Sequence, residues 1–345
     1  MAGNFRGLSR WALISILLIC MIIPLSVGAG TIRVAYYDTE LGRDGPGLLL
    51  RDILGGADPQ VAAVAQIITA ARPDILVLSG VDFDVEGLAL GALNATLATP
   101  FEHAFAPRPN TGMPTGLDLD GNGRRGEARD AQGYGRFSGA GGMAVLSRFA
   151  IAAPVQDFSA LLWRDQPGTL MRPEDPGHDV QRLSSLGHWI VPVDVGAFRL
   201  SLAIFRATTP VFDGPEDRNG RRNHDEIAFW TKALTDPARL SPPFVIAGGA
   251  NLDPDRGAGR RQAIRDLLTH PALQDPAPRG AQGNHTVDWP QTDGPGPMRV
   301  DYVLPSADLT LEASGVLWPD TPPLADTAAR ASRHRLVWVD LLLPR

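Results

Sequence analysis

The sequence predicts an α/β fold, and three observations lead to that class. Residues 244–247 are a short apolar run without helical periodicity, which is typical of a buried strand, and glycines and oxygen-bearing side chains follow it. Residues 31–79 alternate strand, helix and strand patterns, as in a parallel pair joined by a helix. Predicted strands outnumber predicted helices, and several end in polar loops, where α/β proteins usually bind ligands.

Composition and charge restrict the possible functions. The 345 residues are 44% hydrophobic and 20% charged, an ordinary globular composition with enough apolar side chains for a sizeable core. Lys232 is the only lysine, so arginine carries almost all of the positive charge. The formal net charge of −6 argues against broad nucleic-acid binding, because phosphate backbones attract basic surfaces.

Residues 1–29 resemble a secretory signal peptide, with two arginines ahead of an apolar run that ends in small residues. An uncleaved anchor is less favoured, because the run is near the lower length limit for a membrane span and Pro24 interrupts its end. Cleavage would remove Cys20, the only cysteine, which suits an oxidising compartment without disulfides. We therefore expect residues 30–345 to form the functional domain, periplasmic or secreted and without membrane attachment.

The first half of the mature chain begins with a predicted strand at residues 31–37, followed by Asp38 and a glycine-rich loop. Asp58 and Pro59 then have the residue types of a helix N-cap and first helical position. Apolar residues in the next three turns share one face, so this helix should pack on a sheet. Residues 74–79 are the second predicted strand.

Residues 107–140 are predicted to be loop. Within them, residues 118–123 alternate oxygen-bearing side chains and close on a glycine, which resembles the first half of a calcium-binding loop. The twelfth position is Arg129, where such loops carry a bidentate Glu. A tight polar turn is therefore the favoured interpretation, and calcium binding is the alternative.

The second half contains a dense polar loop, residues 211–223. Its content of Arg, Asn and carboxylates favours an internally bonded functional loop over a solvated turn, with Arg218, Asn219 and Arg222 as candidate binding residues. A helix capped by Asn223 should follow. A further helix is predicted at 258–270, and further strands at 142–147, 188–195, 200–205, 299–304, 308–316 and 335–342.

The order of these elements and the content of their loops resemble the endonuclease/exonuclease/phosphatase superfamily, which has the DNase I-like fold. The resemblance covers residues 31–345 and is greatest to secreted bacterial members, through the Asp-Leu-Asp-Gly-Asn-Gly and Pro-Glu-Asp-Arg-Asn-Gly-Arg-Arg-Asn loops. It implies a four-layer α/β sandwich, in which helices flank two facing mixed sheets and the active site lies on loops at one end. The family hydrolyses phosphoesters with a divalent metal, usually Mg²⁺.

Part of the family's catalytic pattern is retained. Asp301 and His334 match its orienting Asp and catalytic His, and Asn251 matches the Asn of its Gly-Asp-x-Asn motif. Asp38 stands where the family has an Asn at the end of the first strand, and it could still ligate a metal.

Four other positions of the pattern are replaced. Gly80 stands in place of a metal-binding Glu, Arg206 in place of a His, and Gly249 in place of an Asp. Arg333 replaces the Asp of the final Ser-Asp-His motif and would hold a permanent positive charge beside the expected Mg²⁺. The resemblance therefore implies the family fold with eroded catalytic motifs.

Two functions follow from this combination. The favoured one is a pseudoenzyme that needs no cofactor and binds a phosphorylated or other anionic small molecule, or a partner. Arg206 and Arg333, alongside His334, would hold the oxyanion, because a guanidinium offers a planar pair of donors. An equally favoured interpretation of these arginines is that each pairs with a nearby acid, such as Asp38 or Asp301, to settle buried charge.

The alternative function is an active, Mg²⁺-dependent phosphoesterase with displaced metal ligands. Such chemistry needs hard oxygen ligands and a positioned general base. The candidate displaced ligands are Asp38, Asp82, Asn251 and Asp253.

Overall fold

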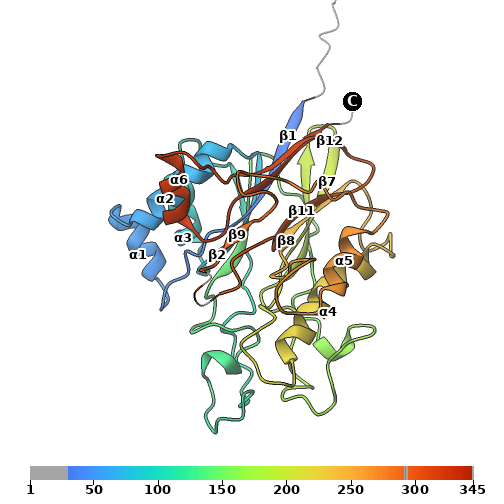
Figure 1. Cartoon of the computed structure of the whole chain (residues 1–345). Helices are drawn as coiled ribbons and strands as arrows, with labels where there is room; N and C mark the ends of the chain where they lie inside the picture. The colour runs from blue at the N-terminus through green and yellow to red at the C-terminus, as the bar shows by residue number, and fades with distance from the viewer. Residues whose placement is uncertain (1–29, 291, 293, 344–345) are drawn as a thin grey trace, which may run out of the picture.

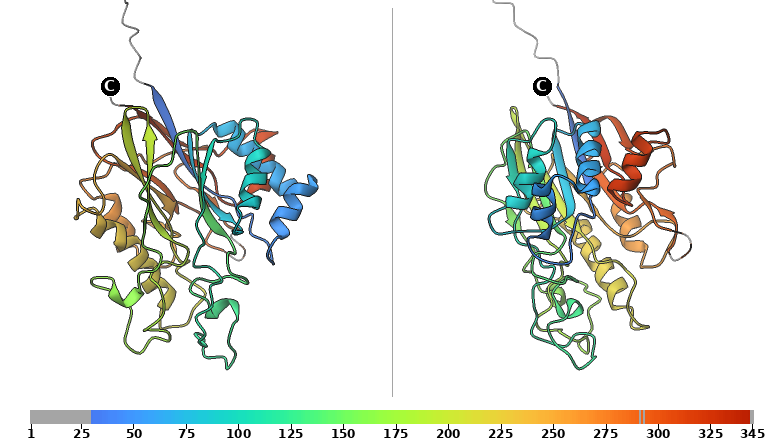
Figure 2. Two further views of the ribbon diagram at one scale, coloured as in Figure 1. Left: turned by 180° about the vertical axis from the view of Figure 1, so that it is seen from behind. Right: turned by 90° about the vertical axis from the view of Figure 1, so that its left-hand side faces the viewer.

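The structure is a computed structural model that describes residues 30–290, 292 and 294–343. The signal peptide predicted at residues 1–29 lies outside the described residues. Two mixed β-sheets face each other, and helices cover the outer face of each, which gives the four predicted layers (Figures 1 and 2). Among the described residues, no helix combines the length and apolar character that crossing a membrane requires.

The first sheet contains the predicted β-α-β unit. β1 (Thr31–Asp38) and β2 (Ile75–Val81) are parallel neighbours, joined through α2 (Pro59–Ala71), while the other neighbours in this sheet are antiparallel. The Asp58 carboxylate caps α2 by accepting the N–H groups of Gln60 and Val61, as the sequence predicted. The spatial order is β12 (Thr310–Val316), β13 (Val337–Leu342), β1 (Thr31–Asp38), β2 (Ile75–Val81), β4 (Gly142–Ser147) and β3 (His103–Phe105).

The second sheet also has one parallel pair, β7 (Phe198–Arg206) and β8 (Phe244–Gly249), connected through α4 (Arg218–Ala233). Its order is β11 (Asp301–Pro305), β8 (Phe244–Gly249), β7 (Phe198–Arg206), β6 (His188–Val195) and β5 (Gln156–Asp157). A separate two-stranded ribbon joins β9 (Val287–Asp288) and β10 (Pro297–Met298).

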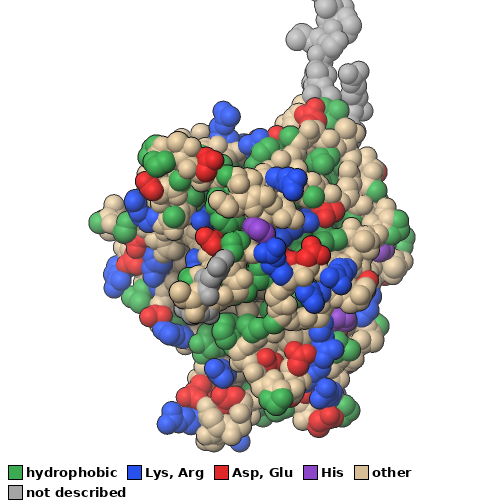
Figure 3. Space-filling model, in the orientation of Figure 1, with side chains coloured by type: hydrophobic (Ala, Val, Ile, Leu, Met, Phe, Trp, Pro, Cys, Tyr) green, Lys and Arg blue, Asp and Glu red, His purple; other side chains and the backbone are tan. Residues whose placement is uncertain are grey.

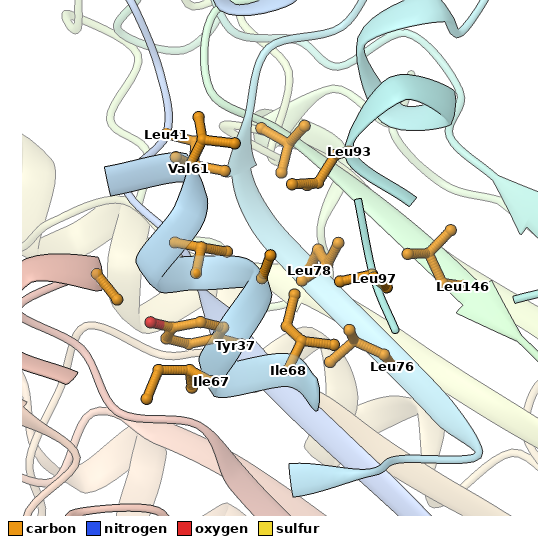
Figure 4. Packing of buried hydrophobic residues seen from close by; sticks show 14 of the residues in the cluster. Tyr37, Leu41, Val61, Ile67, Ile68, Leu76, Leu78, Leu93, Leu97 and Leu146 are labelled. Carbon is orange, nitrogen blue, oxygen red and sulfur yellow. The ribbon is translucent and has the colours of Figure 1, made fainter. Parts of the chain in front are cut away.

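Three buried apolar clusters hold the layers together. The middle cluster lies between the sheets, because alternate residues of each strand point inward. An outer cluster packs α1 (Leu48–Gly55), α2, α3 (Leu88–Ala95) and α6 (Leu324–Ala331) against the first sheet. Figure 4 shows Leu76 and Leu78 of β2 beside Ile68 of α2, with Leu93 of α3 next to Leu78. The other outer cluster packs α4 and α5 (Gln262–Leu268) against the second sheet.

Helix α1 corrects the sequence prediction, which placed a glycine-rich loop there. Leu49 and Ile53, one helical turn apart, are buried against the sheet. The flanking residues Gly47 and Gly56 have φ of 76° and 66°. Gly47 and Gly56 adopt left-handed backbone conformations at the two ends of a helix. The glycines therefore indicate helix ends here and not a continuous loop.

Helix α4 begins at Arg218, so the prediction that Asn223 caps it is wrong. Asp217 occupies the N-cap position with φ of 53° and makes no side-chain cap bond. Asn223 lies inside the helix and is buried, where its side chain bonds to two loop carbonyls. Tertiary hydrogen bonds have therefore overridden its local capping preference. Helix α5 is also shorter than predicted, and six elements had no sequence prediction, namely α3, α6, β3, β5, β9 and β10.

The long segment 107–141 is irregular apart from a short 3-10 turn at Ala128–Asp130, as predicted for most of it. Another 3-10 turn, Trp163–Asp165, interrupts a second irregular segment between β5 and β6. Figure 1 shows the first segment at the bottom of the molecule, opposite the ends of the described chain.

Candidate functional site at one end of the sandwich

The two sheets bring the predicted site residues together at their strand ends. Asp38 is the last residue of β1, and Arg206 and Gly249 are the last residues of β7 and β8. Gly249 is paired in register with both Arg206 and Asp301, the first residue of β11. His334, between α6 and β13, reaches this group through Asp301.

Arg206 forms an ion pair with Asp38 across the two sheets. Nε of Arg206 lies 2.7 Å from Oδ2 of Asp38, and the two side chains are 25% and 1% exposed. Burial raises the pKa of Asp38, but the nearby charges of Arg206 and His334 outweigh it and lower the pKa to about 2. The terminal nitrogens of Arg206 have no hydrogen-bond acceptor among the described residues.

Asp301 and His334 form a buried dyad. Nδ1 of His334 lies 2.8 Å from Oδ2 of Asp301, and its Nε2 lies 4.0 Å from Oδ2 of Asp38. Burial lowers the pKa of His334, but the charges of Asp301 and Asp38 raise it further, to about 8. The ring of Trp289 meets the imidazole edge-on, with centroids 5.8 Å apart. The imidazole is therefore mainly protonated at neutral pH.

Arg333 pairs with Glu40 rather than with a member of the dyad. Its Nε and backbone N–H lie 2.9 and 2.8 Å from the Glu40 carboxylate, and its Nη2 also donates there. The Arg333 side chain is 57% exposed. Both predicted arginines thus have acidic partners, one of which, Asp38, was named from the sequence. Glu40 was missed because it follows its strand by two residues and belongs to no motif.

Gly80 occupies a position that excludes a side chain. Its φ is +74°, at an irregularity in the pairing of β2 with β4. A Cβ atom there would lie 2.7 Å from both Oδ1 of Asp38 and the backbone nitrogen of Glu40. A side chain at position 80, where the family resemblance implies a metal-binding Glu, would therefore be both strained and crowded in this backbone.

Gly249 is crowded for another reason. A Cβ atom on it would lie 2.6 Å from the hydroxyl of Tyr36, which also hydrogen-bonds Ser79 at 2.7 Å. Tyr36 was missed because it lies inside a predicted strand, where an aromatic residue signals only core packing. The space of an acidic side chain at position 249 is thus already occupied.

Asn251 stands at φ 51°, in the left-handed region that Asn tolerates better than most residues. Its side chain is nearly buried, and Nδ2 donates to the carbonyl oxygen of Ala207 at 2.7 Å. Asn251 therefore links the segment after β8 to the segment after β7.

The arginines of the polar loop bind backbone carbonyls. Arg222 is buried and donates to the carbonyl oxygens of Leu183 and Gln132, among others. Arg218 donates to the carbonyl of Pro176, and Asn219 to that of Val211. These contacts join α4 to the neighbouring irregular segments, and none of them reaches the Asp38 carboxylate or the dyad.

The Asp118 loop is a polar turn in which the Asp118 carboxylate accepts the N–H groups of Gly121 and Gly123, each at 2.8 Å. One carboxylate oxygen each from Asp118, Asp120 and Asp130 lies within 4.8 Å of the others. The buried Asp130 carboxylate also accepts backbone N–H groups. The hydrogen bonds of the loop thus account for the predicted turn geometry.

Comparisons with known proteins agree on one family. The model of the Endonuclease/Exonuclease/phosphatase family matches residues 53–334, whereas no curated protein matches the sequence. Among solved structures, an endonuclease/exonuclease/phosphatase from Beutenbergia cavernae is 19% identical with a TM-score of 0.59, covering 91% of this chain and 72% of its own. A mannosyl-6-phosphatase from Bacteroides thetaiotaomicron is 15% identical with a TM-score of 0.52, covering 90% and 100%. Such identities show the shared DNase I-like fold, and with the family match they lead to one conclusion: the chain belongs to the endonuclease/exonuclease/phosphatase family.

Proposed function

We propose that this family member is catalytically silent and that its strand-end site binds an anionic ligand through Arg206 and His334. The observation that carries the proposal is the ion pair between Arg206 and Asp38. It places a permanent cation on the carboxylate that would be the first candidate to hold a metal.

The residues present do not fit a divalent cation. Mg²⁺ requires several hard oxygen ligands in octahedral geometry. Asp38 already accepts a hydrogen bond from Arg206. Burial lowers the pKa of Arg206, but Asp38 and the other neighbouring acidic groups outweigh it, so the pKa is raised and the guanidinium stays charged. Gly80 and Gly249 offer no ligand atoms, and their surroundings exclude added side chains. These strand ends therefore do not supply the ligand set that Mg²⁺ requires.

The site does offer hydrogen-bond donors for an anion. The terminal nitrogens of Arg206 have no protein acceptor among the described residues, and the side chain is partly exposed. Nε2 of His334 likewise has no acceptor within hydrogen-bonding distance in the part of the chain that the structure describes, since Asp38 is 4.0 Å away. A guanidinium edge and an imidazolium N–H together suit a phosphate or carboxylate group.

The charges of the side chains at this site indicate which anions it favours. Three carboxylates, those of Asp38, Glu40 and Asp301, face three cations, Arg206, Arg333 and protonated His334. Because these charges cancel, the site favours a singly charged group, such as a phosphodiester or carboxylate, over a phosphate dianion. A small anion is accordingly the ligand class with the best support.

The displaced-ligand enzyme has less support. The Asp82 carboxylate accepts the N–H groups of Arg43 and Gly141, each at 2.8 Å. The Asp253 carboxylate accepts three backbone N–H groups, including that of Arg299 at 2.7 Å. Both candidate ligands thus use their lone pairs to hold loops.

Calorimetry on EDTA-treated protein tests the proposal. The titrants are phosphate, a dialkyl phosphate and acetate. We expect binding that weakens as the salt concentration rises and that is lost in Arg206→Gln. In parallel, Mg²⁺ should cause no hydrolysis of phosphodiester or phosphomonoester substrates. Anion binding absent at low salt would overturn the ligand assignment, and turnover of about 1 per second or faster would overturn the catalytic silence.

A further inference from the structure

Glu226 of α4 accepts hydrogen bonds from two backbone segments that lie next to Arg206. Its side chain is fully buried, and its two carboxylate oxygens accept the backbone N–H groups of Ser185, at 2.6 Å, and Thr208, at 2.5 Å. The hydroxyl of Ser185 in turn donates to the carbonyl oxygen of Arg206 at 3.2 Å. One carboxylate therefore fixes both the residue that holds the Arg206 carbonyl and the segment that leaves β7.

Asn223, one turn earlier on the same helix, joins the ends of the two parallel strands. Its Nδ2 donates to the carbonyl oxygens of Thr208 and Ala250, each at 2.7 Å. Asn251 adds a third link to Ala207. The spacing between the ends of β7 and β8 is thus set by side-chain amides, beyond the last β-ladder pair.

These buried groups need a structural or functional reason, because burying a carboxylate costs free energy unless it is well bonded. Burial raises the pKa of Glu226, while Arg222 and the two backbone N–H groups lower it. An apolar side chain would avoid this cost but could not orient two backbone amides. The bonds converge on the segment that carries the free guanidinium edge of Arg206.

We infer that Glu226 and Asn223 are positioning residues for the anion site, holding Arg206 at the spacing from Asp38 that leaves its terminal nitrogens without an acceptor among the described residues. They do not touch the ligand. This inference rests on the proposed anion binding, and it assigns a role to α4, whose first residues, 218–223, the sequence had placed in a candidate binding loop.

Glu226→Gln tests the inference with an isosteric change. The amide can accept one backbone N–H but presents a donor to the other, so one of the two links is lost. We expect the dissociation constant for phosphate or dialkyl phosphate to rise about tenfold, the scale of one lost charged hydrogen bond. Ser185→Ala, which removes only the hydroxyl bonded to the Arg206 carbonyl, should raise it less and is the milder variant if Glu226→Gln folds poorly.

Asp225→Asn is the matched control on the same helix. Asp225 is also fully buried, and its Oδ2 accepts from Trp163 Nε1 and Leu170 N at 2.7 and 2.6 Å, away from the strand ends. We expect both substitutions to lower the melting temperature similarly, but only Glu226→Gln to weaken anion binding. Equal anion affinities in the two variants would overturn the positioning role.

A second readout does not depend on the ligand. The ¹⁵N–¹H signal of Arg206 Nε, identified by its loss in Arg206→Lys, reports the hydrogen bond to Asp38. It should shift or broaden in Glu226→Gln and stay unchanged in Asp225→Asn. If the parent protein binds no anion, the proposed function fails, and this signal alone decides the inference: an unchanged signal in Glu226→Gln refutes it.

Discussion

Nε of Arg206, at the end of one sheet, lies 2.7 Å from Oδ2 of Asp38, at the end of the other. A guanidinium thus neutralises a carboxylate that is almost completely buried. In the proposed function, the Arg206 guanidinium stands where the family resemblance implies a divalent cation. The pair also links the two sheets of the sandwich at the site.

The first prediction concerns the stability that this pair provides. Arg206→Met should leave the buried Asp38 carboxylate without its partner and lower the free energy of unfolding by about 3 kcal/mol. In the double variant Asp38→Asn/Arg206→Met, the loss should be smaller than the sum of the two single losses. Urea denaturation at pH 7 measures both quantities.

Arg199→Met is the control, because Arg199 lies on the same strand and pairs with Asp194 at 2.7 Å, but both side chains are about half exposed. An exposed ion pair contributes little to stability. The Arg206 pair would lose its assigned role if Arg206→Met were as mild as this control.

The second prediction is that restoring the family's carboxylates does not restore the metal site. Gly80→Glu places a side chain at φ +74° against Asp38 and Glu40. We expect the combined variant Gly80→Glu, Arg206→His, Gly249→Asp, Arg333→Asp to show no Mg²⁺ binding by calorimetry. Micromolar Mg²⁺ binding would show that the backbone can readjust.

Gly80→Ala and Gly47→Ala separate strain from crowding. Both glycines have nearly equal φ, +74° and +76°, but a Cβ on Gly47 meets nothing within 4 Å. Gly47→Ala should cost about 1 kcal/mol of unfolding free energy from backbone strain alone. Gly80→Ala should cost about 1–3 kcal/mol more, because its Cβ meets two fixed groups. Equal losses would locate the whole effect in the backbone conformation.

The sequence predicted the strand ends well, because short buried strands have a clear apolar pattern and the family motifs lie at their ends. Asp38, Arg206, Asp301 and His334 were therefore all placed correctly in the same group. The pairing of Arg206 with Asp38 was one of two equally favoured interpretations, since charge alone cannot decide between an internal acid and a ligand.

Other parts of the site could not be predicted. The crowding at Gly249 depends on Tyr36, a strand-interior residue from the opposite sheet. Asn223 has the residue type of a helix cap, and only its two tertiary hydrogen bonds show that it lies inside the helix. Both depend on contacts between segments distant in sequence, which local patterns do not specify.

The third prediction is a loss of stability at mildly alkaline pH through His334. Its pKa rises from 6.5 to about 8 on folding, so the protonated form stabilises the folded state. This contribution is fully present below pH 6.5 and is lost as pH rises through 8. The shift corresponds to about 2 kcal/mol, so the free energy of unfolding should fall by that amount between pH 6 and 9.

His334→Gln should remove most of this pH dependence. His188 does not contribute to the pH dependence between pH 6.5 and 9, because burial lowers its pKa to about 4. Its ionisation changes the stability only at pH values below 6.5. Urea denaturation of both proteins at pH 6, 7, 8 and 9 measures the difference. A parent curve that is flat over this range would contradict the assigned ionisation of His334.

The last prediction ranks the two arginines as anion ligands. Arg333 shares its Nε and Nη2 with Glu40 and is 57% exposed, whereas Arg206 gives only its Nε to Asp38. Arg206→Gln should therefore weaken dialkyl phosphate binding at least about tenfold, the effect of losing a charged bidentate contact. Arg333→Gln should weaken it about threefold or less, because an exposed charge acts through screened attraction.

The salt dependence of anion binding further distinguishes the contribution of Arg206 from that of Arg333. The small effect of Arg333→Gln should vanish as NaCl rises from about 50 to 500 mM. The Debye length then becomes shorter than the separation between the exposed Arg333 charge and the anion. The effect of Arg206→Gln should persist, since direct contact with a partly buried guanidinium is less screened. If Arg333→Gln abolishes binding and Arg206→Gln does not, the anion binds at the Glu40 pair, and the Arg206 edge is not the site.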